Sequence, residues 1–235
     1  MVLDINNIDV LYDDFQVIWD VSLNVKKGEM VALLGPNGSG KSTILNTISN
    51  LVSHKNGSIK FNGKLISLLP TFSRTGMGIS HVLERRRVFP HLSVKQNLLL
   101  GAWHKEAKKK RDNSLINIYE IFPKLKTRSD QLAKTMSGGE QQMLAIARGL
   151  MGLPKLLMVD EPFLGLSPLV VKDLIKIFRN ITDSGISILF VEQNVRLALS
   201  MADRGYVLES GRLVVSGSSE DLIDNEKVKK IFLGN

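Results

Sequence analysis

Apolar positions along this 235-residue chain follow two different periods. Near the start, residues 3–12, 21–25, 29–35 and 57–63 alternate as strands do, and the turn at 26–29 joins the second to the third. Further on, residues 155–161 and 187–193 are short runs rich in Val, Ile and Leu, which suit strands buried on both faces. A stretch with helical spacing, residues 169–181, separates them. This alternation predicts a parallel sheet with helices packed on it.

The middle of the chain, from about residue 92 to 150, has a helical pattern, and residues 204–215 read as a hairpin followed by two short helices. There is no internal repeat, low-complexity tract or Pro/Ser-rich linker. We therefore predict one continuous α/β domain over residues 1–235, with an antiparallel β part near its start. Its core would span about 1–83 and 153–235, and an inserted helical lobe about 84–152.

Composition adds few constraints. Apolar residues make up 43% and charged residues 23%, as in ordinary globular proteins. No apolar run approaches the ~20 residues that span a bilayer. The first residues carry acids and lack the basic and apolar pattern of a signal peptide, so we expect the chain to stay in the cytosol. The chain has no cysteine, which excludes disulfides and thiolate metal sites.

The net charge of +8 gathers in two runs, residues 85–87 and 105–111. A solvated helix face explains such runs in many proteins. Anionic lipid headgroups and nucleic acid are the alternatives. Charge alone does not separate these three interpretations.

The stretch at residues 35–42 fits the pattern G-x-x-x-x-G-K-[ST], after an apolar strand and before a helix. Glycines let backbone N–H groups converge on a phosphate, and the helix start adds a favourable dipole. Lys41 can reach the β- and γ-phosphates, and the Ser42 hydroxyl can bind Mg²⁺. This P-loop predicts binding of a nucleoside triphosphate through Gly35, Pro36, Asn37, Gly38, Ser39, Gly40, Lys41 and Ser42.

Two carboxylates end the buried run at residues 155–161, at the edge where open α/β sheets bind ligands. Asp160 can hold Mg²⁺, and Glu161 can polarise an attacking water. Taken alone, the pair is also compatible with a plain strand-to-turn transition. Gln193 follows the next strand, so it would lie beside them and sense the γ-phosphate if the two strands are neighbours; otherwise it simply leaves the sheet.

A second glycine-rich stretch, Ser137-Gly138-Gly139-Glu140, opens a helix with an apolar stripe. Ser137 and Glu140 form a capping box, which explains those two residues as an ordinary helix start. Two adjacent glycines weaken a helix start unless something approaches the backbone closely. The glycines therefore indicate a contact that the capping box does not explain.

The stretch "MSGGEQQMLAIARGL" resembles the signature of the ATP-binding cassette (ABC) family, and "GPNGSGKST", "LLMVDEP" and "VEQN" follow in the order and spacing of that family. The resemblance covers essentially the whole chain. It implies a P-loop NTPase fold with ATP and Mg²⁺ as cofactors and ATP hydrolysis as the activity. It also implies that two cassettes, identical or sister chains, pack head to tail. Ser137, Gly138 and Gly139 would then contact the ATP held by the partner.

Further residues carry over by the same resemblance. Tyr12 matches the aromatic that stacks on adenine, although a half-buried strand tyrosine is the ordinary alternative. Thr43 would touch the α-phosphate. Glu84 stands where the family usually has a Gln that senses magnesium and water, and Gln193 stands where a switch His is usual. A further departure is Ser167, where the family usually has Asp, and the missing His puts the switch mechanism in question.

Glu84 and Gln193 make the chain similar to the second ATPase subunit of branched-chain amino acid importers. This resemblance implies membrane-spanning permease subunits as partners, a periplasmic or extracellular binding protein as an indirect one, and a peripheral place on the cytoplasmic face of the membrane. Phe163 and the final residues also resemble the lipopolysaccharide-export cassette. A cytosolic ABC ATPase that binds nucleic acid is a third possibility, though the single, compactly spaced set of motifs argues against a nucleic-acid partner. A metabolic kinase would leave the signature helix unexplained.

Overall fold

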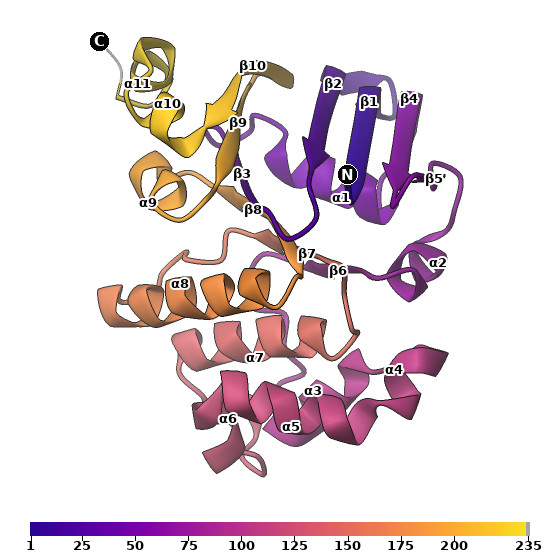
Figure 1. Cartoon of the computed structure of the whole chain (residues 1–235), viewed down its shortest axis with the longest axis vertical. Coiled ribbons are helices and arrows are strands. Elements are labelled where there is room, and N and C mark those ends of the chain that lie inside the picture. Colours follow the sequence, from indigo (N-terminus) through magenta and orange to yellow (C-terminus); the bar gives the residue numbers. More distant parts are fainter. Residues whose placement is uncertain (234–235) are drawn as a thin grey trace.

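Two β-sheets lie beside a lobe of helices in the computed structural model, which describes residues 1–233 (Figure 1). The larger sheet has six strands in the order β10-β9-β3-β8-β7-β6. All neighbours pair in parallel except β9 with β10. The strands are β3 (Met30–Leu34), β6 (Ile79–Val82), β7 (Leu156–Asp160), β8 (Ser187–Glu192), β9 (Arg204–Glu209) and β10 (Arg212–Ser218). The predicted α/β class and the terminal hairpin are confirmed.

The smaller sheet is antiparallel, in the order β2-β1-β4-β5. Its strands are β1 (Leu3–Tyr12), β2 (Phe15–Val25), β4 (His54–Phe61) and β5 (Lys64–Leu65). Strand β2 begins six residues before the stretch predicted from the sequence. Asn7 and Asp20 have positive φ, at 49° and 51°, where the β1–β2 register shifts. Such bulges break the two-residue alternation on which the sequence prediction depended.

The central strands bury both faces, which explains their unbroken apolar sequences. Along β3, Val31 and Leu33 face one core with the antiparallel sheet and helix α1 (Lys41–Ser49). Met30, Ala32 and Leu34 face the other core. Helices α7 (Gly138–Leu150) and α8 (Pro168–Asp183) contribute to that second core, and both lie on the lower side of the sheet in Figure 1. The sheet is therefore fixed from both sides.

The helical lobe is inserted between β6 and β7, which confirms the helical pattern expected over residues 92–150. It contains α3 (Val94–Gly101), α4 (Lys105–Lys109), α5 (Arg111–Ile121), α6 (Pro123–Thr127), the 3₁₀ turn η1 (Ala133–Thr135) and α7. The remaining helices are α2 (Thr71–Gly76), α9 (Val195–Leu199), α10 (Ser219–Ile223) and α11 (Glu226–Leu233). None of the helices within residues 1–233 has both the length and the apolar composition needed to cross a membrane.

The two basic runs have different environments. Residues 105–111 lie on α4 and at the start of α5, and all but Glu106 and Ala107 are exposed cations, which agrees with a solvated helix face. Residues 85–87 are not helical; they belong to the connection between β6 and α3. The helix-face interpretation is therefore wrong for that run; the contacts of Arg86 and the groove that Arg87 lines are described below.

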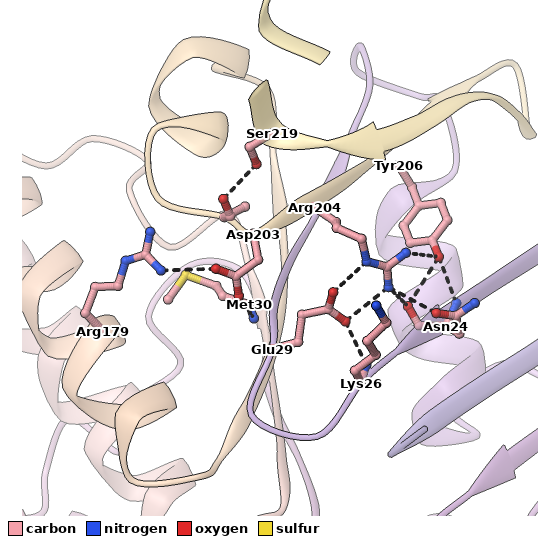
Figure 2. Close-up of polar contacts among 10 residues, drawn as sticks. Asn24, Lys26, Glu29, Met30, Arg179, Asp203, Arg204, Tyr206 and Ser219 are labelled. Carbon is pink, nitrogen blue, oxygen red and sulfur yellow. Dashed lines mark hydrogen bonds and ion pairs between the residues drawn. The ribbon is translucent and has the colours of Figure 1, made fainter. Parts of the chain in front are cut away.

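A polar network ties the antiparallel sheet to the larger one (Figure 2). Arg204 of β9 pairs with Glu29, and its guanidinium also donates to the carbonyl oxygen of Asn24 at 3.0 Å and to the Tyr206 hydroxyl at 3.1 Å. Burial alone would raise the pKa of Glu29, but hydrogen bonds from Arg204 and from the Lys26 backbone N–H outweigh it and hold the pKa below its usual value. The charged form of Glu29 thus stabilises the fold.

Replacing Glu29 by Ala leaves the Arg204 guanidinium without its carboxylate in a largely buried place, and we expect a loss of roughly 3 kcal/mol in the free energy of unfolding. Urea unfolding at pH 7 measures it. The matched control is Glu226→Ala, which removes an exposed ion pair and should change the free energy by less than about 0.5 kcal/mol. Because the folded-state pKa of Glu29 is lowered, its contribution is present at neutral pH and disappears as the pH falls through that pKa. A deficit of equal size at pH 7 and pH 3 would contradict this account.

Candidate functional site

The P-loop, residues 35–42, joins β3 to α1 at the carboxyl edge of the large sheet. Gly38 and Gly40 have φ of 77° and 102°, a conformation that other residues rarely adopt. A Cβ at Gly35 would lie 2.3 Å from the carbonyl oxygen of Leu208 on β9, so only glycine fits there. These requirements fix the loop in a curve that ends at the N-terminus of α1, where free backbone N–H groups favour a phosphate.

Lys41 is held inside this loop. Its Nζ donates to the carbonyl oxygens of Gly35 and Pro36, each at 2.9 Å, and the residue is only 5% exposed. Burial lowers the pKa of Lys41, while the negative charges of Glu161 and Asp160 oppose that shift. An ammonium group has three N–H donors, so one remains for a phosphate oxygen. The Lys41 ammonium is thus held at the centre of the P-loop, and its contact with phosphate stays a prediction.

Two residues predicted as magnesium ligands contact each other: Ser42, in the first turn of α1, and Asp160, at the end of β7. The Ser42 hydroxyl donates to Oδ1 of Asp160 at 3.1 Å. Burial raises the pKa of the Asp160 carboxyl, and the nearby charges of Glu161 and Glu84 raise it further. A divalent cation would relieve this concentration of negative charge, and oxygen ligands suit Mg²⁺.

The same residues show what kind of magnesium site fits. Within the described residues there is no group of three or more His, Cys, Asp or Glu side chains arranged to hold a metal. Mg²⁺ in nucleotide sites is commonly bound through one or two protein oxygens together with substrate phosphates and water. Ser42 and Asp160 supply such a pair, and Glu84 lines the same pocket.

Glu161 and Gln193 also come together, because β7 and β8 are parallel neighbours with Asp160 opposite Val191. The Gln193 Nε2 donates to Oε1 of Glu161 at 2.6 Å. Glu161 has φ 47°, and its backbone N–H donates to the carbonyl oxygen of Val191 at 3.1 Å. The side chain of the proposed base is therefore oriented both by its own backbone turn and by Gln193.

Glu192, which the sequence analysis did not single out, stabilises the turn that carries Gln193. Its buried carboxylate accepts the backbone N–H groups of Gln193 at 3.0 Å and Asn194 at 3.3 Å. Burial raises the pKa of this carboxyl. Its place at the end of a buried strand, directly before Gln193, was a signal for this role in the sequence.

An open pocket of about 560 Å³ connects these side chains. The sequence predicted most of its lining but missed Val17 of β2 and Leu164, neither of which belongs to a motif. Tyr12 does not line this pocket; it ends β1 and is 44% exposed. Adenine stacking by Tyr12 stays a prediction. The lining residues are Val17, Asn37, Gly38, Gly40, Lys41, Ser42, Thr43, Glu84, Glu161, Leu164 and Gln193.

The signature residues Ser137, Gly138 and Gly139 lie elsewhere. Ser137 caps α7 in a complete capping box with Glu140. A Cβ added at Gly138 would lie 2.0 Å from Nη1 of Arg86, and one at Gly139 would lie 2.9 Å from Val170. None of the three signature residues lines the P-loop pocket. Packing against Val170 favours glycine at 139, and the signature lies apart from the P-loop pocket of its own chain.

Comparisons with known proteins agree with this geometry. A sequence model described as ABC transporter matches residues 18–164. The chain belongs to the ABC transporter family. The high-affinity branched-chain amino acid transport ATP-binding protein BraG of Pseudomonas aeruginosa is 42% identical over 233 residues, which cover 99% of this chain and 100% of BraG. The lipopolysaccharide export system ATP-binding protein LptB of Haemophilus influenzae is 34% identical, over 99% of this chain and 97% of LptB.

Solved structures show the same relationship. The ADP conformation of MJ1267, an ATP-binding cassette of an ABC transporter, superposes with a TM-score of 0.88 at 27% identity, covering 100% of this chain and 99% of that one. The chain is thus an ATP-binding, ATP-hydrolysing subunit of an ABC transporter. The fold expected from the resemblance is confirmed.

Exchanging Glu161 for Gln keeps the size of the side chain and removes the carboxylate, so ATP should still bind while turnover falls by a factor of about 100 or more. Lys41→Ala should abolish detectable turnover because it removes the cation in the P-loop. Phosphate release and the binding of a fluorescent ATP analogue measure the two steps separately. An isolated Glu161→Gln subunit that hydrolyses ATP at the rate of the unmodified chain would remove Glu161 as the base.

Proposed function

We propose that this chain powers the import of branched-chain amino acids through separate permease subunits. The 42% identity to BraG over nearly the whole of both chains carries this proposal. Glu84 and Gln193, which set the chain apart from the usual family pattern, agree with it. The chain would lie on the cytoplasmic face of the membrane and would depend indirectly on a substrate-binding protein. It would not bind nucleic acid.

The second candidate is a lipopolysaccharide-export cassette, favoured by the similarity to LptB over 99% of this chain. Phe163 and the final residues of the sequence add to this similarity. The identity to LptB is lower than that to BraG, at 34% against 42%. We therefore place export second.

In the catalytic cycle we propose, Lys41 and the P-loop amides hold the phosphates, with Thr43 near the α-phosphate. Ser42, Asp160 and Glu84 would hold Mg²⁺, and the bound ion would neutralise part of the phosphate charge. Glu161, oriented by Gln193, accepts a proton from the attacking water. The role of Gln193 as a γ-phosphate sensor in place of His belongs to this proposal.

The isolated signature residues support a head-to-tail dimer. Ser137, Gly138 and Gly139 lie at the start of a 13-residue helix and outside the pocket of their own chain. A second cassette, identical or related, would bring its ATP to them. Each subunit would then complete the site of the other, and the residues 84–152 would form the helical lobe that moves with ATP binding.

A groove between the sheet and the helical lobe is suited to the permease. It has a volume of about 440 Å³, and its rim carries Leu51, Phe89, Leu100 and Trp103, all 44–53% exposed. Exposed apolar side chains in a group mark interaction surfaces. Asn97 fixes the segment at Phe89, because its side chain bonds both the backbone N–H of Phe89, at 2.8 Å, and its carbonyl oxygen, at 3.0 Å.

The floor of this groove is basic. Arg74, Arg87 and Arg148 line it, and no acidic residue does. Burial lowers the pKa of Arg148, and its Nη1 is buried without a hydrogen-bond partner, as is Nε2 of His81. Burial also lowers the pKa of His81 to about 4, so this imidazole is neutral at physiological pH. Arg87, in contrast, is exposed, so a permease segment with apolar side chains and a hydrogen-bond acceptor for Arg87 fits these surroundings.

The identity of the transported substrate is tested by measuring the uptake of labelled leucine in cells of the source organism from which this chain has been deleted. We expect uptake to fall, and to return with the unmodified chain but not with Lys41→Ala. Normal leucine uptake together with less lipopolysaccharide on the cell surface would favour the export candidate and contradict the importer.

Trp103→Glu puts a charge on the apolar rim of the groove and should reduce recovery of the permease with the affinity-tagged chain at least fivefold in mild detergent. The control is Leu68→Glu, because Leu68 is 93% exposed and does not line the groove. ATP binding by the isolated chain should be unchanged in both variants. Equal recovery of permease with both variants would place the docking surface elsewhere.

A further inference from the structure

Arg86 sits at the meeting point of three segments that the catalytic cycle above treats separately. It belongs to the connection after Glu84, and its Nη2 donates to the carbonyl oxygens of Leu164 at 3.1 Å and Gly165 at 3.2 Å. Those two residues lie in the loop between β7, which ends at Asp160, and α8. The same guanidinium lies against Gly138, the first residue of α7. One side chain therefore spans the connection, the loop after Glu161 and the signature.

The backbone around Arg86 supports this position. Arg86 has φ 52°, a conformation that is uncommon for residues other than glycine. A Cβ at Gly138 would lie 2.0 Å from Nη1 of Arg86, and one at Gly165 would lie 3.3 Å from Nη2. The first of these glycines thus makes room for the guanidinium on the signature itself.

The charge of Arg86 is not neutralised where it lies. Within residues 1–233, no carboxylate oxygen lies within 4.0 Å of its guanidinium: Glu84 pairs with Arg85, and Glu140 pairs with Arg128. The partners of Arg86 are two neutral carbonyl groups that engage Nη2, which leaves the donors of Nη1 and Nε for another ligand.

The surroundings of Arg86 add further positive electrostatic potential and do not neutralise its charge. Gly138 begins a 13-residue helix, whose N-terminal end carries a partial positive charge. A guanidinium placed against that end is unfavourable by itself, and an anion that contacts both groups from the side relieves the repulsion. Guanidinium groups bind phosphate oxygens with two parallel hydrogen bonds, which a lysine cannot do.

We propose that Arg86 is part of the half-site that the signature offers to the second subunit, and that it contacts the terminal phosphate of the ATP held by that subunit. The inference rests on the head-to-tail dimer proposed above and adds a cation to it. Its bonds to Leu164 and Gly165 also link this contact to the loop that follows Glu161 of its own chain. Arg86 is thus a phosphate ligand in trans.

The test uses the full chain carrying Glu161→Gln, so that ATP is bound and not consumed, with Mg²⁺ and millimolar ATP in sedimentation velocity runs. We expect an ATP-dependent dimer. On this background Arg86→Met should raise the dissociation constant of that dimer at least tenfold. Arg86→Lys keeps the charge, and its dissociation constant should lie between those of the parent and Arg86→Met. The matched control is Arg111→Met, an exposed arginine of the helical lobe, for which we expect less than a twofold change.

Two further readouts separate this role from a structural one. Binding of a fluorescent ATP analogue to the monomer should be the same for Arg86→Met and its parent, since the ligand of Arg86 belongs to the other subunit. The thermal unfolding midpoint should fall by a few degrees at most, because the substitution removes only the two hydrogen bonds to Leu164 and Gly165. A variant that loses monomer binding, or whose midpoint falls far more than this, would show that Arg86 acts on its own chain and would overturn the inference.

The remaining outcomes are also decisive. A tighter dimer in Arg86→Met would mean that the side chain covers the signature, and an unchanged dimer would mean that it does not reach the partner; both overturn the inference and leave the composite site intact. If the parent with Arg86 stays monomeric at every ATP concentration, the head-to-tail dimer itself is wrong, and the inference falls with it.

Discussion

Burial of the central strands on both faces is the constraint on which the rest of the molecule depends. Strands β3, β7 and β8 have no polar face, so each is held between two cores and ends at the same edge of the sheet. Side chains at the ends of these strands, or in the short loops that follow them, are therefore brought to the same edge. Lys41, Asp160, Glu161 and Gln193 are brought together in this way, although they come from distant parts of the sequence.

Burial of the charged side chains then sets the chemistry at that edge. The buried ammonium of Lys41 and the buried carboxyl of Asp160 both have pKa values shifted towards the neutral form, in opposite directions. A nucleotide with its cation supplies both missing partners at once, a negative phosphate for Lys41 and a positive charge for Asp160. The site is electrostatically prepared for the complex of metal and nucleotide rather than for either component alone.

The residues that the sequence identified are those whose chemistry depends on their immediate neighbours. A P-loop needs its glycines at fixed spacing, and Asp160 and Glu161 follow an apolar run, so these positions were readable. Val17, Leu164 and Arg86 were not, because their roles come from contacts made after folding with segments remote in the chain. The basic run at 85–87 shows the limit clearly: a solvated helix face was one interpretation of its charge. The backbone there is instead irregular, with Arg85 and Arg86 both at positive φ, and Arg86 and Arg87 turn to different surroundings.

The four hydrogen bonds of the Asn97 side chain have a mechanical consequence. Fully buried on α3, this amide holds the backbone of Phe89, Leu92 and Ser93, so the apolar tip formed by Phe89 has no hinge separating it from the helix behind it. A displacement of α3 would therefore carry Phe89 with it. A neighbouring protein seated against Phe89 would be pushed or pulled by a stiff body, and the distance travelled would be fixed by the rotation of the whole lobe.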